Sequence, residues 1–242
     1  MTPLEEPSNV SARRVAVLVT GSESPPEDWV FVVECLRPRG IEAVAVDLPS
    51  NRLADATRAD DIAETRAAIA NAQGPVVVVG WSYGGRVISD AAIGEDNVVR
   101  LVYVAALPYP AHPAAGDEPP THPPDLSHTL FPDEKTFVTD DQWWLTDGDG
   151  ITFPEHVIAH LWAHRRRPMS IAAAVGPQQG DAWRTIPTTV LLGRNDERNP
   201  AEDQDWARSH LADVRLIDSD HFIPFRQPEV VADLIEEALT SH

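Results

Sequence analysis

The chain carries the stretch Val76-Val77-Val78-Val79-Gly80-Trp81-Ser82-Tyr83-Gly84-Gly85. Four consecutive valines are typical of a fully buried strand, and the amphipathic residues 86–93 predict a helix directly after it. Ser82 then lies in the sharp turn between the two elements, where glycines on either side let the backbone bend tightly. The N-terminus of the following helix would also offer N–H groups to a developing oxyanion. This G-x-S-x-G pattern between a strand and a helix predicts a nucleophilic serine.

A serine hydroxyl is a weak nucleophile until a base takes its proton, and the base needs a third group that holds its tautomer. Among the nine histidines, His221 is the best placed, because it follows the short apolar stretch 214–217. Reactive groups in parallel sheets gather beyond the carboxyl ends of the strands, and both Ser82 and His221 have that position. The sequence therefore predicts His221 as the general base.

The orienting acid should also follow a strand. Asp196 follows the apolar stretch 188–193 and is the predicted acid, although a turn or helix-capping role near Pro200 would also suit an aspartate there. Asp218 and Asp220 compete for the role. Both lie close to His221 in sequence and reach its far ring nitrogen poorly, and we expect Asp220 to accept a local backbone hydrogen bond.

Strand and helix patterns alternate along most of the chain, which predicts an α/β fold with a mostly parallel sheet of about six or more strands and helices on both faces. The strand patterns lie near 14–20, 42–47, 76–80, 99–105, 188–193 and 214–217, and the helical patterns near 28–37, 58–72, 84–93, 200–211 and 228–240.

The alternation is interrupted after the fourth strand. A proline-rich stretch, 108–124, is followed by helical patterns near 133–144, 154–166 and 168–175. We therefore divide the chain into a flexible N-terminus at 1–12, a core at 13–107 and 187–242, and an inserted segment at 108–186.

The order serine, acid, histidine, with each residue after its own strand, resembles the α/β-hydrolase family. Residues 80–85 and 101–106 look similar to small cofactor-free bacterial esterases and to the plant methylesterase and hydroxynitrile lyase group. The resemblance implies the α/β-hydrolase fold with a helical cap at 108–186. The lyases of that group place a lysine directly after the catalytic histidine. Phe222 stands there in this chain, which disfavours cyanohydrin cleavage.

The resemblance also implies an oxyanion hole. In α/β-hydrolases one N–H comes from the residue after the nucleophile, here Tyr83, and another from the loop after the first parallel strand. That loop opens Thr20-Gly21-Ser22, so the second donor is the N–H of Ser22. Relatives often begin this loop with His-Gly, whereas this chain has Thr-Gly.

We expect the cap to determine substrate specificity. Ligand pockets are usually lined by apolar and aromatic side chains, and the cap contains several of them. Phe153 and Leu161 also offer apolar surface there, and such residues serve equally well to keep a small helical unit packed. The predicted pocket residues are Trp81, Trp143, Trp144, Trp162 and Phe222.

No metal or organic cofactor is predicted. His156, His160 and His164 repeat at four-residue spacing, which resembles a row of metal ligands, but no catalytic glutamate lies between a pair and no further ligand is apparent. A polar face of a cap helix is the preferred interpretation. The glycines near Ser82 lack the G-x-G-x-x-G pattern of a dinucleotide site.

The composition of the chain limits the kinds of partner and location that we expect. A net charge of −19 argues against nucleic acid and anionic membranes, because a polyanion would be repelled. No apolar run approaches the ~20 residues that span a bilayer, and residues 1–12 contain no apolar signal segment, so a cytoplasmic location is expected. The single cysteine, Cys35, excludes an internal disulfide and is expected to be structural. The basic run 165–167 is expected to close a cap helix.

The predicted function is hydrolysis of a carboxylic ester of a small or medium apolar substrate through an acyl-enzyme on Ser82. A lactonase, thioesterase, acyltransferase, C–C hydrolase or perhydrolase would use the same three residues, so these stay open. Two other classes also stay open: a ligand sensor with slow turnover, and an interaction module with a vestigial site. Neither the natural substrate nor the oligomeric state is predicted.

Overall fold

The structure is a computed structural model that describes residues 13–115, 118–122, 126–141, 143 and 153–241. Its centre is a six-stranded parallel sheet with the strand order β2-β1-β3-β4-β8-β9. The strands are β1 (Val15–Val19), β2 (Glu42–Val46), β3 (Val76–Trp81), β4 (Val98–Val104), β8 (Thr188–Gly193) and β9 (Val214–Ile217). The strands predicted from the sequence are confirmed.

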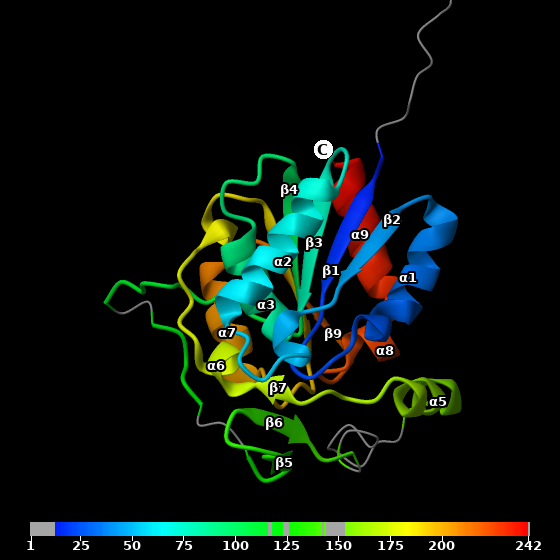
Figure 1. The fold of residues 1–242 in the computed structure, drawn as a ribbon. Coiled ribbons are helices and arrows are strands. Elements are labelled where there is room, and N and C mark those ends of the chain that lie inside the picture. The colour runs from blue at the N-terminus through cyan, green and yellow to red at the C-terminus, as the bar shows by residue number, and fades with distance from the viewer. Residues whose placement is uncertain (1–12, 116–117, 123–125, 142, 144–152, 242) are drawn as a thin grey trace, which may run out of the picture.

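Helices cover both faces of the sheet, as predicted (Figure 1). Alternate residues of β1 enter different cores: Ala16 and Leu18 pack on the face of the first and last helices, and Val15 and Val17 on the opposite face. The first face holds α1 (Val30–Leu36), α8 (Ile223–Arg226) and α9 (Pro228–Thr240). The opposite face holds α2 (Arg58–Asn71), α3 (Tyr83–Ala91) and α7 (Ala201–His210). Every residue of β1 and β3 is buried, which explains why both strands lack polar side chains and why β3 begins with four valines.

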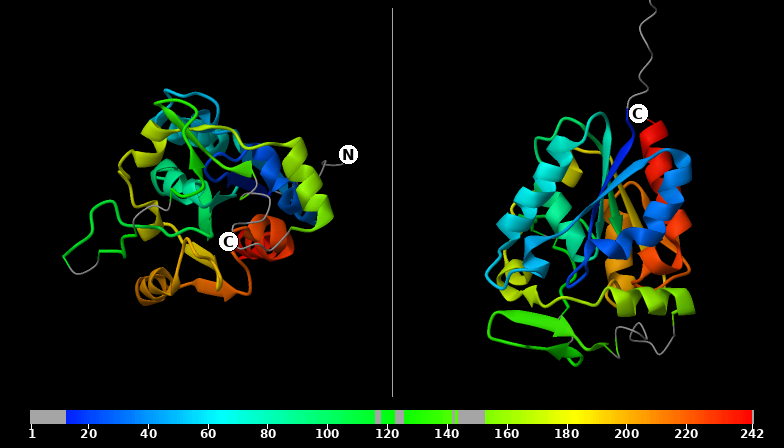
Figure 2. Two further views of the ribbon diagram at one scale, coloured as in Figure 1. Left: turned by 90° about the horizontal axis from the view of Figure 1, so that it is seen from below. Right: turned by 45° about the vertical axis from the view of Figure 1, so that its right-hand side comes forward.

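An insertion is defined here as the chain between β4 and β8, and most of its described helices and strands lie at the carboxyl ends of the strands of the main sheet (Figures 1 and 2). It contains an antiparallel sheet of β5 (Thr129–Leu130), β6 (Thr136–Thr139) and β7 (Met169–Ser170), together with α5 (Glu155–Ala163) and α6 (Ile171–Val175).

The helix expected near 133–144 is wrong, because residues 136–139 form strand β6. Asp133 accepts hydrogen bonds from the backbone N–H groups of Lys135 and Thr136, which fixes a turn before the strand. The β-branched Thr136, Val138 and Thr139 then favour extended backbone. The second predicted insertion helix is confirmed but ends at Ala163, so the basic run 165–167 does not close it.

The parallel arrangement brings the ends of β1, β3, β8 and β9 to one edge of the sheet. Ser82 follows β3, Asp196 follows β8 and His221 follows β9. Within the described part of the chain, no helix has the length and apolar character needed to cross a membrane.

Candidate active site

Ser82 occupies a strained turn. Its φ of 53° and ψ of −119° lie where an L-residue is disfavoured. The turn is so tight that a Cβ on Gly80 would lie 2.6 Å from the backbone carbon and oxygen of Gly84, and a Cβ on Gly84 would lie 2.4 Å from the carbonyl oxygen of Val19. Only glycine fits at both places, which explains the G-x-S-x-G spacing.

We expect Gly84→Ala to disrupt this turn. The new methyl group would overlap backbone atoms, which cannot turn aside as a side chain can, so we expect a loss of about 3 kcal/mol of folding stability. For a chain of this size that lowers the midpoint of thermal unfolding by roughly 6–12 °C. The matched control is Gly94→Ala, because Gly94 has a φ of +78° but open space around it. Similar losses in the two variants would contradict the steric argument.

The structure brings Ser82, His221 and Asp196 together in one hydrogen-bonded chain. His221 Nε2 lies 2.9 Å from Ser82 Oγ, and His221 Nδ1 lies 2.9 Å from Asp196 Oδ2 and 3.1 Å from Oδ1. His221 and Asp196 are buried, whereas Ser82 is partly exposed. A serine, a base and an orienting carboxylate therefore have the geometry of a nucleophilic triad.

Asp196 is held as a carboxylate. Burial alone would raise its pKa, but interaction with His221, the Asn199 side-chain amide and the Arg198 N–H outweighs burial and lowers the pKa below the ordinary value. Asn199 Nδ2 lies 2.7 Å from Oδ2, and the Arg198 N–H donates to Oδ1 at 2.9 Å. A carboxylate with these partners stays ionised and can orient the imidazole.

The competing aspartates have other partners. Asp218 accepts a hydrogen bond from the Asn195 side chain. Asp220 accepts the backbone N–H of Phe222 at 2.9 Å, the local bond expected from the sequence, and also pairs with Arg226. The carboxylate of Asp196 contacts the His221 ring at Nδ1.

The two predicted oxyanion donors belong to segments that lie next to Ser82. Tyr83 is the first residue of α3, so its N–H has no partner within the helix. The loop after β1 also approaches the serine, since a Cβ on Gly21 would lie 3.3 Å from Ser82 Cβ. The Tyr83 ring points away into the core, where its hydroxyl donates to Asp61 at 2.7 Å. Burial raises the pKa of Tyr83, so the ring serves as an uncharged anchor for the turn.

Aromatic side chains gather around His221. Trp81 Nε1–H donates to the His221 carbonyl at 2.9 Å, and its ring lies 6.3 Å from that of Phe222. Phe222 also contacts the insertion through Phe153, at 5.3 Å, and Trp143, at 6.5 Å between ring centroids. Trp81 and Phe222 are almost fully buried, so both support the histidine, whereas Trp143 is only partly buried.

The other two predicted pocket residues, Trp162 and Trp144, are not seen in this aromatic group. Trp162 is 50% exposed on α5, and the Arg165 guanidinium lies over its ring at 5.0 Å. The opposite face of that helix, with Val157 and Leu161, is the buried one. The structure therefore does not bring Trp162 into the aromatic group around His221. Trp144 lies outside the described residues.

Two histidines of the predicted row, His156 and His160, lie on α5 beside Phe31. The rings of His156 and His160 meet Phe31 edge-on, and His160 Nε2 lies 3.3 Å from the buried carboxylate of Asp28. Among the described residues, no group of three or more potential ligands is close enough to hold a metal ion.

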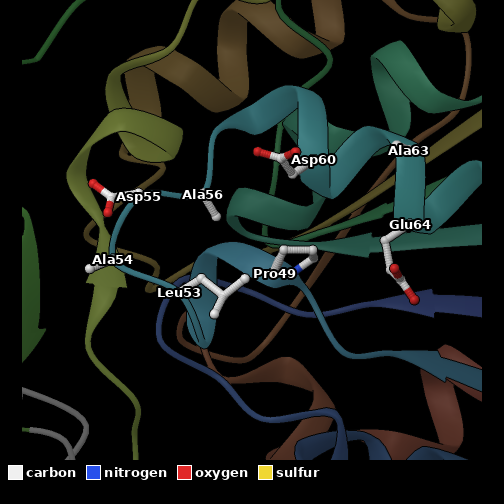
Figure 3. A pocket seen from close by; sticks show the side chains of 8 residues that line it. All are labelled: Pro49, Leu53, Ala54, Asp55, Ala56, Asp60, Ala63 and Glu64. Atoms are coloured by element: carbon white, nitrogen blue, oxygen red, sulfur yellow. The ribbon is translucent and has the colours of Figure 1, made fainter.

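A cavity of about 670 Å³ lies beside the start of α2, apart from Ser82, His221 and Asp196 (Figure 3). Its wall is largely alanine and acidic residues, and it contains none of the three residues of the hydrogen-bonded chain. Asp60 there caps α2 through Thr57, and Asp55 pairs with Lys135. These acids therefore have structural partners.

Comparison with known proteins identifies the family of this chain. Residues 16–234 match the alpha/beta hydrolase family. The chain belongs to this family. A relative in Aspergillus novofumigatus, the alpha/beta hydrolase nvfD, is 28% identical over 200 residues, which are 74% of this chain and 77% of nvfD. Family membership supports a hydrolase.

Solved structures show the same fold as this hydrolase. A pyrethroid hydrolase from Sphingobium faniae JZ-2 is 20% identical and has a TM-score of 0.75, with 94% of this chain and 98% of that one covered. The methylesterase MES16 from Arabidopsis is 16% identical and has a TM-score of 0.72, with 95% and 100% covered.

Sequence reasoning missed several polar residues of this hydrolase. Asn199 is buried, and its amide bridges Asp196 and the carbonyl oxygen of Ala105. Its spacing of three residues after the aspartate, in a loop, is the one local signal of that contact. Asn51, Glu23 and Arg166 also gather around the loop after β1, and their long sequence separation leaves no pattern to find.

Proposed function

We propose that this protein is a serine esterase that cleaves carboxylic esters of small or medium apolar substrates through an acyl-enzyme on Ser82. The observation that carries the proposal is the pair of 2.9 Å contacts from the His221 ring, one to Ser82 Oγ and one to Asp196 Oδ2. Together they supply a base for the serine proton and an acceptor for the second ring N–H.

In the first half-reaction, Ser82 Oγ attacks the ester carbonyl while His221 Nε2 takes its proton. The carbonyl oxygen becomes an oxyanion, and the N–H groups of Tyr83 and Ser22 stabilise it. Asp196 accepts the Nδ1–H and stabilises the imidazolium. The imidazolium then protonates the leaving alcohol as the tetrahedral intermediate collapses to the acyl-enzyme.

In the second half-reaction, water takes the place of the alcohol. His221 removes a proton from the water as it attacks the acyl carbonyl, and the same two N–H groups receive the oxyanion. The proton then returns to Ser82 Oγ as the carboxylic acid leaves. No cofactor takes part in these steps.

The surroundings of His221 favour an ester over a cyanohydrin substrate. Phe222 directly follows the histidine and is buried among aromatic rings, so it offers no cation to a cyanide leaving group. The partly buried Trp143, in contact with Phe222, favours an apolar acyl or alkyl group. A methylesterase and a pyrethroid hydrolase among the structural relatives support the same class of substrate.

The test is a substrate panel on the purified protein. We expect release of p-nitrophenol from acetate, butyrate and hexanoate esters, with saturation kinetics. Faster turnover of thioesters or lactones, or transfer to added alcohol or peroxide in preference to water, would assign one of the related reactions. Tight retention of a product with negligible turnover would contradict an esterase and favour a sensor.

Trp143→Ala should change the preference among acyl chains. One methylene in an apolar pocket is worth about 1–3 kcal/mol, so loss of the ring should alter the ratio of hexanoate to acetate kcat/KM by about tenfold. The matched control is Trp162→Ala, because Trp162 is half exposed and lies under Arg165. An unchanged ratio in Trp143→Ala would assign that ring to packing alone.

A further inference from the structure

Glu23 has an unusual backbone for its residue type. It directly follows Ser22 in the loop after β1, is 2% exposed and has a φ of 63°. This left-handed conformation is disfavoured for residues that carry a Cβ, and glycine usually fills it. A glutamate in such a position needs side-chain contacts that compensate.

The Glu23 carboxylate makes those contacts with residues of the insertion. Thr139 of β6 donates its backbone N–H to Oε2 at 2.7 Å and its hydroxyl to Oε1 at 3.1 Å. Arg166, beyond the end of α5, donates its Nε–H to Oε2 at 2.8 Å. The Glu23 and Arg166 side chains are 3% and 5% exposed. Loss of either partner would therefore leave a buried charge without its counterpart.

Arg166 also reaches the backbone of the same loop. Its Nη2–H donates to the carbonyl oxygen of Ser22 at 2.6 Å. One guanidinium thus holds both the Glu23 carboxylate and the Ser22 carbonyl through two separate nitrogens of its planar fork, a geometry that the single nitrogen of a lysine does not reproduce.

Asn51 holds the loop from the other side. Its Nδ2–H donates to the Gly21 carbonyl at 3.2 Å, and its Oδ1 accepts the Glu23 N–H at 2.9 Å. The Gly21 carbonyl and the Ser22 N–H belong to one planar trans peptide, so they point in opposite directions. The bond from Asn51 therefore sets the direction of the Ser22 N–H, in a loop whose Gly21 approaches Ser82.

We propose that Glu23 and Arg166 are positioning residues that aim the Ser22 N–H at the oxyanion and make its alignment depend on the docked insertion. The inference rests on the proposed esterase function and adds to it a link between the insertion and the chemical step. Displacement of Arg166 and Thr139 releases Glu23 from its left-handed conformation, and the donor then loses its direction. Substrate contacts in the insertion are thereby coupled to stabilisation of the transition state.

The test uses Glu23→Gln and Arg166→Lys in the full chain. A glutamine in place of Glu23 is uncharged and cannot accept hydrogen bonds on both sides of its head group. A lysine in place of Arg166 has one nitrogen where the arginine uses two to bond Glu23 and the Ser22 carbonyl. Loss of one oxyanion donor typically costs 10²–10³-fold in kcat, and a misdirected donor should cost about ten- to a hundredfold. We expect that fall in kcat in both variants, with KM of the p-nitrophenyl ester within about twofold of wild type.

A pair of inhibitors separates positioning from structural support. An alkyl trifluoromethyl ketone forms a tetrahedral adduct with an oxyanion, whereas the matching methyl ketone resembles the ground state. We expect the inhibition constant of the fluorinated ketone to rise in parallel with the fall in kcat, and that of the methyl ketone to stay unchanged. The control is Arg167→Gln. Arg167 follows Arg166 directly, but its side chain pairs with Asp47 and Glu27, so we expect the variant to leave both inhibition constants unchanged.

Each other outcome has a distinct meaning. A lower unfolding midpoint with normal kcat and normal ketone inhibition would make the pair a structural clamp and overturn the inference. A rise in KM and in methyl ketone inhibition constant at constant kcat would make it a substrate contact, with the same consequence. A wild-type protein that neither cleaves the ester nor binds the fluorinated ketone would overturn the proposed function and this inference with it.

Discussion

Ser82→Ala is expected to lower kcat for p-nitrophenyl esters by about a million-fold, the loss typical when the nucleophile of a triad is removed. The hydroxyl is the atom that forms the acyl-enzyme, and the structure offers His221 a contact to this oxygen at 2.9 Å. The residual rate would come from binding and the oxyanion donors alone. The fall in kcat is measured with fixed-time assays. These assays need enough protein to detect the residual rate.

The fold should survive the substitution, because alanine fills the same turn with a smaller side chain. The midpoint of thermal unfolding is the check, and we expect it within a few degrees of wild type. Ser209→Ala is the matched control, since Ser209 is an exposed serine whose hydroxyl bonds the Trp206 carbonyl. Unchanged turnover in Ser82→Ala would remove Ser82 from the mechanism.

Asp196→Asn is expected to lower kcat by about 10⁴-fold with little change in KM. The asparagine keeps the shape of the side chain, but its amide nitrogen offers a donor where the His221 Nδ1–H needs an acceptor. The imidazole would then favour the wrong tautomer, with a proton on Nε2, and could not accept the Ser82 proton. Steady-state kinetics of the purified variant measure this fall.

The neighbouring aspartate provides the control for this substitution. Asp218→Asn changes a residue of the same loop as His221, and its carboxylate bonds the Asn195 side chain rather than the imidazole. We expect its kcat within about twofold of wild type, as for most surface changes. A large fall in Asp218→Asn with normal kcat in Asp196→Asn would show that Asp196 is not the orienting acid.

Local patterns were sufficient to predict the parallel sheet and the residues at its carboxyl edge. The valines of β3 and the glycines around Ser82 report burial and a tight turn directly, because each is required by its own neighbours in the chain. His221 and Asp196 were found because each follows a strand, and parallel strands end at the same edge. Their distances came only from the structure.

The insertion was predicted less well, because its structure depends on distant contacts. Residues 136–139 pair with β5 and β7, and neither short strand has enough residues to show a period in the sequence. Arg166 likewise belongs to a basic run that suits a helix end, yet it is buried against Glu23, 143 residues away. Contacts of that kind are tertiary and override local preference.

The most direct measurement is intact-protein mass spectrometry after reaction with a fluorophosphonate probe, run on wild type and Ser82→Ala beside an assay of p-nitrophenol release. An assembled triad should give one adduct on the wild-type chain, no adduct on the variant, and ester turnover by the wild type alone. The absence of an adduct on folded wild-type protein, or an adduct that persists in Ser82→Ala, would contradict the assignment of Ser82 as the nucleophile.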